Sequence, residues 1–409
     1  MKNDKISTIA MLGCFDTKAA DFNFLYTCLK KQGLEVISIN TGVLGRTDRF
    51  PITYEAEAVA LSGGQSLLDL QKNHDRGKAI EVMGKGAGQI LSTLCETQRI
   101  DGVIGMGGGG GTYIFLSAMQ QVPFGLPKIC LSTLATKDLS SQILAKDITL
   151  IPSIVDVAGL NKISRVLINQ AAGALAGMIN AGMPEAEETK GTIAISIFGN
   201  TTPCVDACSA LLSSRGYEVM TFHAVGAGGK TMEALIRENC FDGVLDITTT
   251  ELADELCDGI CSAGPDRLTA AAEMNLPQVV VPGCLDMVNY GALDSVPERY
   301  KSRLLFSWAP DVTLMRTNEE ENKVLGQSFA QKINQSKRAV TVLLPLKGIS
   351  KVSAEGGIFY QPHLDQILFD TIKKSVKDHI QIIELDAHIN DISFAQRAVD
   401  ELLVLMGKK

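Results

Sequence analysis

The sequence predicts an α/β protein built from two duplicated, Rossmann-like domains, each with a doubly wound parallel sheet. Three observations predict this class. Short runs rich in Ile and Val alternate with segments whose apolar residues recur at helical spacing. A large part of the first half recurs in the second half. Glycine or threonine clusters follow several apolar runs, at the strand ends where parallel sheets bind their ligands.

The internal repeat sets the domain organisation. Three segments of the first half recur in the same order in the second: residues 8–42 at 192–226, 99–112 at 240–253, and 156–180 at 311–334. Ordered matches of this kind indicate gene duplication. We therefore expect an N-terminal domain at 1–185, a C-terminal domain at 190–409, and a join in the polar stretch 183–191.

The strands of each half are short and apolar at both alternating positions, as expected for parallel strands covered on two faces. In the first half they are expected at residues 7–13, 34–42, 101–107, 127–133 and 147–153. In the second half they are expected at residues 192–199, 217–226, 241–249, 277–283 and 303–308. The tail adds two strand–helix units that either complete the second domain or pack across both: strands 339–345 and 380–387 with helices 364–376 and 394–406.

Charge and composition exclude several classes of partner. The formal net charge is −8 without a basic run, which argues against nucleic acid, because that binding depends on Lys and Arg neutralising phosphates. No apolar stretch is long enough to span a membrane, and the N-terminus leads directly into a strand without a signal-peptide cleavage site. Ten cysteines lie mostly in apolar segments. We expect a cytoplasmic protein.

The run Gly105 to Thr112 follows an expected strand and precedes an expected helix. Glycines let backbone N–H groups approach a phosphate, and the start of a helix adds unpaired N–H groups and the positive end of its dipole. The next strand ends in Ser132 and Thr133 without an acidic residue, so an NAD site is not expected. The run is either a phosphate cradle or a close helix–strand packing turn. The expected phosphate contacts are Gly107, Gly108, Gly109, Gly110, Gly111, Thr112, Ser132 and Thr133.

The first strand ends in a second candidate segment, Gly13 to Lys18. Asp16 is expected to hold Mg²⁺ or a hydroxyl group, Thr17 to donate to a phosphate, and Lys18 to offset the phosphate charge. The alternative is that Asp16 or Thr17 caps the following helix.

The second half carries different residues at the matching strand ends. Its counterpart of the first segment keeps the hydroxyls of Thr201 and Thr202 but lacks the carboxylate and the lysine. The stretch 223–231 resembles a P-loop, but Ala224 stands where its first glycine is required. These residues either bind a small anionic metabolite or serve as helix caps and structural hydrogen bonders. The expected substrate contacts are Thr201, Thr202, His223, Lys230, Thr248, Thr249, Thr250, Glu251 and Arg316. No catalytic triad and no zinc spacing is recognised.

Ordered motifs over nearly the whole chain resemble the Tm-one-like ATP-binding domain family, which is named for a tomato mosaic virus resistance protein. They are FDTK, DGVIGMGGGGGT, VDVAGLNKISR, GNTTPCVDAC, DGVLDITTTELADEL, SAGPDRL, PQVVVPGCLDMVNYG, TLMRTNEEENKVLG, LLPLKGIS and LDAHIND. Asp156, Asn161 and Arg316 match family positions in addition to the loops above. Ala19 and the stretch 307–311 depart from the family pattern.

The resemblance implies a two-domain α/β protein that binds ATP with Mg²⁺ and forms a homo-oligomer. Two hypotheses with bound ATP follow for its function, beside a third in which the chain is a non-nucleotide enzyme that uses the loops for a sugar phosphate or a carboxylate. In the first, ATP on the glycine loop drives a reaction on a small anionic metabolite in a cleft between the domains. In the second, ATP regulates a protein-interaction module that has no catalytic activity.

Overall fold

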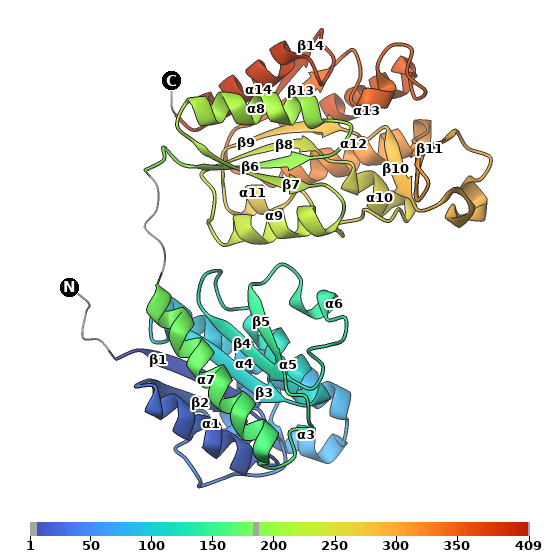
Figure 1. The fold of residues 1–409 in the computed structure, drawn as a ribbon. Helices are drawn as coiled ribbons and strands as arrows, with labels where there is room; N and C mark the ends of the chain where they lie inside the picture. The colour runs from blue at the N-terminus through green and yellow to red at the C-terminus, as the bar shows by residue number, and fades with distance from the viewer. Residues whose placement is uncertain (1–5, 183–187, 408–409) are drawn as a thin grey trace. The chain divides into compact units, whose positions relative to one another are not determined.

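The computed structural model describes residues 6–182 and 188–407, which divide into two compact units, Met1–Ala186 and Glu187–Lys409. Residues 183–187 of the expected join lie outside the described part of the chain. Each unit is an α/β domain with helices on both faces of a parallel sheet (Figure 1). The predicted fold class is confirmed.

The first unit contains a five-stranded parallel sheet in the order β2-β1-β3-β4-β5. Its strands are β1 (Thr8–Gly13), β2 (Glu35–Asn40), β3 (Gly102–Gly107), β4 (Lys128–Ser132) and β5 (Ile148–Pro152). Its helices are α1 (Ala19–Lys31), α2 (Ala56–Ser62), α3 (Leu67–Asn73), α4 (Arg76–Glu96), α5 (Gly109–Met119), α6 (Ser140–Ile143) and α7 (Lys162–Ala181). The strand order reverses direction between β1 and β3, and open α/β sheets bind ligands at such a switch point.

Both faces of this sheet are covered, which explains why its strands are apolar at every position. Ile9 and Met11 of β1 belong to the hydrophobic cluster under α1 and α7. Ala10 and Leu12 belong to the cluster under α2, α4 and α5. Alternating side chains therefore enter two separate cores, as expected for a parallel strand.

The second unit contains a six-stranded parallel sheet in the order β14-β13-β9-β8-β6-β7. Its strands are β6 (Thr192–Ile197), β7 (Glu218–His223), β8 (Gly243–Thr248), β9 (Gln278–Gly283), β13 (Val340–Pro345) and β14 (Ile380–Leu385). Its helices are α8 (Thr202–Ser214), α9 (Ala227–Arg237), α10 (Glu251–Cys257), α11 (Ala270–Glu273), α12 (Glu319–Ile333), α13 (Pro362–Ser375) and α14 (Ile392–Leu405), with 3₁₀ segments at Leu293–Ser295, Glu298–Tyr300 and Lys351–Ser353. The tail thus completes the sheet of this unit.

One expected strand has a different place. Residues 303–308 were expected to continue the second parallel sheet, but β11 (Leu305–Ala309) pairs antiparallel with β12 (Val312–Arg316) in a separate sheet that also contains β10 (Met287–Tyr290). Exposed and half-buried side chains of β11 suit a sheet with one solvated face. The position beside β9 is taken by β13 instead.

The two units share their strand register. Ile9 of β1 lies opposite Gly102 of β3. Ile193 of β6 lies opposite Gly243 of β8. The duplication inferred from the sequence therefore extends to the pairing of individual residues, and matching positions in the two units can be compared directly.

No helix within residues 6–182 and 188–407 combines the length and the apolar character needed to cross a lipid bilayer.

Candidate functional site

A cavity of about 660 Å³ lies at the β1/β3 switch point of the first unit. This volume is within the range of small-molecule sites. The loops after β1, β2 and β3 line it together with the start of α4. Its lining residues include Cys14, Asp16, Thr17, Lys18, Thr41, Gly42, Val43, Leu44, Leu70, Gln71, His74, Asp75, Arg76, Ala79, Ile80, Met83, Ile114, Asp156 and the run Gly107 to Gly111.

The glycine run forms the start of α5. Gly108 is the N-cap of this helix, and no side chain caps it. Within the described part of the first unit, the N–H groups of Gly109, Gly110 and Gly111 have no hydrogen-bond partner; the first helical bond is donated by the Thr112 N–H to the Gly108 carbonyl at 2.9 Å. A Cβ on Gly109 would meet nothing within 4 Å. The unpaired N–H groups and the helix dipole make this end of the cavity suited to an anion.

Three residues expected to contact phosphate stand behind this loop. The buried hydroxyls of Thr112 and Ser132 lie 2.6 Å apart, and that of Thr112 also donates to the Gly108 carbonyl at 2.9 Å. The Thr133 N–H donates to the Gly107 carbonyl at 3.3 Å. None of the three lines the cavity. Their observed contacts fix the end of β3 against that of β4.

Asp16 lies at the end of β1 and shapes the cavity wall. Its two carboxylate oxygens accept N–H groups of Thr17 at 2.7 Å and of Leu44 at 2.8 Å. A Cβ on Gly42 would lie 2.4 Å from the Asp16 carboxylate, so a larger residue there would displace this carboxylate. Asp16 therefore connects the β1 and β2 loops while its remaining lone pairs face the cavity.

Thr17 is exposed, whereas Lys18 is half-buried beside the cavity. The Lys18 ammonium donates to the carbonyl of Val157 in the loop after β5. That contact uses one of its three protons and holds the charge at the cavity edge. Cys14 also lines the cavity, and burial raises the pKa of its thiol, which keeps it protonated.

The start of α4 is a part of the site that the sequence interpretation missed. Gln71, His74, Asp75 and Arg76 line the cavity from the α3–α4 junction. Asp75 is the N-cap of α4 and accepts the Lys78 N–H at 2.9 Å. A capping aspartate before an amphipathic helix was a readable helix-start signal. It did not indicate that this start faces the glycine loop.

The opposite wall is aliphatic. Ile80 and Met83 of α4, Ile114 of α5, Leu70 of α3 and Val43 of the β2 loop line it. The cavity thus combines a polar end, made of uncapped N–H groups and charged side chains, with an apolar body. A ligand with an anionic group attached to a flat or apolar body matches this division.

The acidic side chains of the cavity could bind a metal ion that is also coordinated by the bound small molecule. Asp16 and Asp156 both line the cavity, but residues 6–182 and 188–407 contain no cluster of three metal-binding side chains. Mg²⁺ commonly binds through one or two carboxylates together with phosphate oxygens and water. Asn161, which the family resemblance also singled out, accepts the N–H groups of Ile163 and Ser164 as the N-cap of α7.

The matching edge of the second unit is closed. Thr248, Thr249, Thr250 and Glu251 are fully buried, as is Thr201. The hydroxyls of Thr201 and Thr248 lie 2.7 Å apart, and that of Thr249 donates to a carbonyl of β9 at 3.1 Å. The Thr202 hydroxyl donates to the Phe198 carbonyl at 3.1 Å. All of these contacts lie within the second unit.

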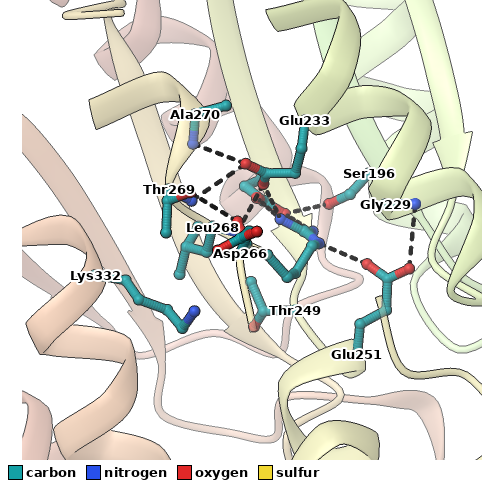
Figure 2. A network of polar contacts seen from close by, with 12 residues as sticks. Ser196, Gly229, Glu233, Thr249, Glu251, Asp266, Leu268, Thr269, Ala270 and Lys332 are labelled. Carbon is teal, nitrogen blue, oxygen red and sulfur yellow. Dashed lines mark hydrogen bonds and ion pairs between the residues drawn. The ribbon is translucent and has the colours of Figure 1, made fainter. Parts of the chain in front are cut away.

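Glu251 belongs to a buried ionic network in which Arg267 joins three carboxylates (Figure 2). One of its oxygens accepts the N–H groups of Gly226 at 2.7 Å and Gly229 at 3.2 Å, where α9 begins. The other accepts from Arg267 at 2.5 Å. Burial raises the pKa of the Glu251 carboxyl, against the opposing effect of Arg267. Two N–H groups of the P-loop-like stretch are therefore occupied by a carboxylate of the chain itself.

Arg267 also contacts two further acids. It forms a bidentate pair with Asp246 at 2.5 and 2.6 Å and an ion pair with Glu233 at 3.2 Å. Glu233 in turn accepts the N–H groups of Leu268 and Ala270 at the start of α11 (Figure 2). Both acids and the guanidinium are buried.

The remaining predicted substrate contacts are dispersed over the second unit. Lys230 is exposed in the first turn of α9, and His223 at the end of β7 packs edge-on against Phe198. Arg316 is buried and pairs with Asp365 at 2.6 Å. Burial raises the pKa of Asp365 to about 7, although Arg316 opposes this shift. Among the residues described for this unit, no hydrogen bond or ion pair joins Arg316 to the Glu251 network.

Comparison with known proteins agrees with this two-unit architecture. Residues 7–184 match the description "Uncharacterised protein family (UPF0261) N-terminal domain", and residues 190–406 match the C-terminal domain of the same family. A UPF0261 protein of Clostridium tetani is 44% identical over 401 residues, 98% of this chain and 99% of that protein. A UPF0261 protein of Rhizobium meliloti is 40% identical and covers 96% of this chain and 97% of its own length.

The resemblance stated from the sequence motifs is confirmed as well. The ToMV resistance protein Tm-1 of Solanum lycopersicum is 39% identical over 340 residues, which are 81% of this chain and 45% of the plant protein. Since both family domains match in order and the two UPF0261 relatives are similar over nearly their full length, the chain belongs to the uncharacterised protein family UPF0261.

Proposed function

We propose that the first unit binds ATP, together with Mg²⁺, in the cavity at the β1/β3 switch point. The observation that carries this proposal is the uncapped start of α5, whose three glycine N–H groups have no partner in the described first unit and border a cavity of about 660 Å³. Phosphates bind at such helix starts because the N–H groups and the dipole both favour negative charge.

The charged side chains around this helix start suit a phosphate chain. Lys18 and Arg76 supply positive charge at the cavity edge. Asp16 and Asp156 are the residues that would hold Mg²⁺, and the metal would supply charge neutralisation at the phosphates. The aliphatic wall formed by Ile80, Met83 and Ile114 suits the flat, weakly polar adenine ring.

The proposal concerns binding, and it does not extend to the second unit. There the counterpart of α5 is α10, whose first residue is Glu251, and the buried Glu251 carboxylate fills this edge and accepts two N–H groups at the start of α9. This contrast between the two copies supports one nucleotide per chain.

Titration calorimetry of the full chain with ATP in the presence and absence of Mg²⁺ tests the proposal. We expect one site per chain and weaker binding when EDTA removes the metal. Asp16→Asn should reduce the Mg²⁺-dependent part of the affinity on the order of tenfold, about 1.4 kcal/mol. The matched control is Asp206→Asn, which removes the same charge at an exposed position of α8.

Absence of binding heat at millimolar Mg·ATP would contradict the proposal. Equal affinity for ATP and for inorganic triphosphate would also count against it, because the apolar wall would then have no role in recognition.

A further inference from the structure

The duplication provides an internal comparison for the anion position in the first unit. Gly102 and Gly243 occupy the same register position in β3 and β8. Counting forward from these glycines places Gly110 at the position of Glu251. Both residues lie in the first turn of the helix that follows the third strand of their unit, α5 and α10 respectively.

In the second unit, the side chain at this position is the anion itself. The Glu251 carboxylate lies against the start of α9, so close that a Cβ on Gly229 would be 2.1 Å from Oε2 (Figure 2). All of its described partners donate: Gly226 N–H, Gly229 N–H and the Arg267 guanidinium. A group that only accepts hydrogen bonds here is an ionised carboxylate. The anion at the start of helix α9 is thus a side chain of the protein itself.

In the first unit, Asp75 caps the matching helix start, and the position of Glu251 is taken by a glycine, which has no side chain. Helix α4 connects the second and third strands, as α9 does in the second unit. Its first residue, Arg76, faces the glycine loop: a Cβ on Gly110 would lie 3.4 Å from Nη2 of Arg76 and 3.2 Å from Cδ1 of Ile80. Arg76 is exposed to the cavity and forms no ion pair with any residue of the described chain. The neighbouring Asp75 carboxylate is engaged by the Lys78 N–H at 2.9 Å.

From this comparison we infer that an anionic group of the ligand binds between Gly110 and Arg76, at the position that the second unit fills with Glu251. The inference rests on the proposed nucleotide site and specifies how that site selects its ligand. Arg76 is the specificity-determining residue, because its planar guanidinium pairs with two phosphate oxygens at once. Gly110 leaves room for the phosphate where a longer residue would displace it.

Two substitutions test the inference by calorimetry with Mg·ATP and, separately, with adenosine, which has no phosphate. Gly110→Glu introduces the residue that the second copy carries and should abolish Mg·ATP binding, because its carboxylate would pair with Arg76. Arg76→Gln should weaken Mg·ATP binding on the order of tenfold or more and leave the affinity for adenosine unchanged. Arg76 is exposed, so this variant is expected to fold normally.

Gly177→Glu is the matched control. A Cβ on Gly177 in α7 meets nothing within 4 Å, and the residue is exposed, so the same change of charge should leave binding unchanged. Far-ultraviolet circular dichroism of each variant checks the fold.

The outcomes separate this inference from the proposed function. If the wild-type chain binds neither Mg·ATP nor adenosine, the proposed nucleotide site is wrong. If the wild-type chain binds Mg·ATP but Arg76→Gln or a folded Gly110→Glu variant binds it equally well, the nucleotide site stands and the anion position inferred here is overturned.

Discussion

At the scale of single residues, Arg267 carries a fully buried charge in the second unit. Its guanidinium is buried with three carboxylates, those of Asp246, Glu251 and Glu233. Burying charges is expensive, and the pairing recovers this cost only while all partners are present. Loss of the arginine would leave three acids without their counter-ion.

We therefore expect Arg267→Met to destabilise the second unit by about 3–5 kcal/mol, the usual loss when one partner of a buried ion pair is removed. Urea unfolding followed by tryptophan fluorescence measures this loss. Trp308 is the single tryptophan of the chain and lies in the second unit, so the signal reports that unit alone.

Arg215→Gln is the comparison variant. Arg215 is half-buried and pairs with Asp400 at 2.9 Å near the surface, where an ion pair contributes at most about 1 kcal/mol. Equal losses for the two variants would show that the buried network contributes no more than a surface pair.

The same network shows what the sequence could predict about the site. The strand-end rule correctly placed Glu251 at the carboxyl edge of the second sheet, since that follows from local pattern alone. It could not reveal that Arg267, in a loop beyond α10, donates a hydrogen bond to this carboxylate. Arg76 was missed for a related reason: it lies at a helix start rather than a strand end, and only the three-dimensional fold brings it to Gly110.

At the scale of elements, close contact between α2 and α4 depends on glycine. A Cβ on Gly86 of α4 would lie 1.9 Å from the Val59 carbonyl oxygen of α2 and 2.8 Å from the Gly63 nitrogen. Backbone atoms cannot move aside as a side chain can. The two helices therefore pack at a distance that only glycine permits.

Gly86→Ala is expected to destabilise the first unit by about 1–3 kcal/mol, the typical cost of overpacking a core. Urea unfolding monitored by circular dichroism should show the loss, while Trp308 fluorescence, which reports the second unit, should be unchanged. Gly177→Ala should instead stabilise α7 by up to about 1 kcal/mol, because its added methyl group meets no neighbour. A neutral Gly86→Ala variant would indicate that α2 can shift freely on α4.

At this scale the sequence pattern also led to one wrong strand pairing. All parallel strands of the first unit were predicted within two residues at each end, because each is a continuous apolar run between turn signals. For residues 303–308 the run was a true strand, β11, but its partner could not be read from the pattern. The repeat suggested a fifth parallel strand, whereas the long tail supplied β13 for that position.

At the scale of the whole molecule, each hydrophobic cluster of buried residues found within 6–182 and 188–407 belongs to a single unit. Two clusters contain only residues of the first unit, and the other four only residues of the second. Each unit therefore has the independent core that defines a domain.

We expect residues 1–186 and 187–409 to fold as separate proteins. The first should unfold cooperatively in urea and bind Mg·ATP with the affinity of the full chain, because the described lining residues of the cavity all belong to it. Circular dichroism and calorimetry of the two halves test this expectation. Failure of the isolated first unit to fold would show that the second contributes to its stability.

Glu251 also has a consequence for how the two units respond to their surroundings. A carboxylate attached to the chain has a fixed effective concentration, so the helix start that it satisfies never becomes vacant. A diffusible anion at Gly110 would instead stabilise the first unit by an amount that rises with the logarithm of its concentration and reaches about 2.7 kcal/mol at 100 times the dissociation constant. One copy of the fold would thus keep constant stability while the other follows the concentration of its ligand.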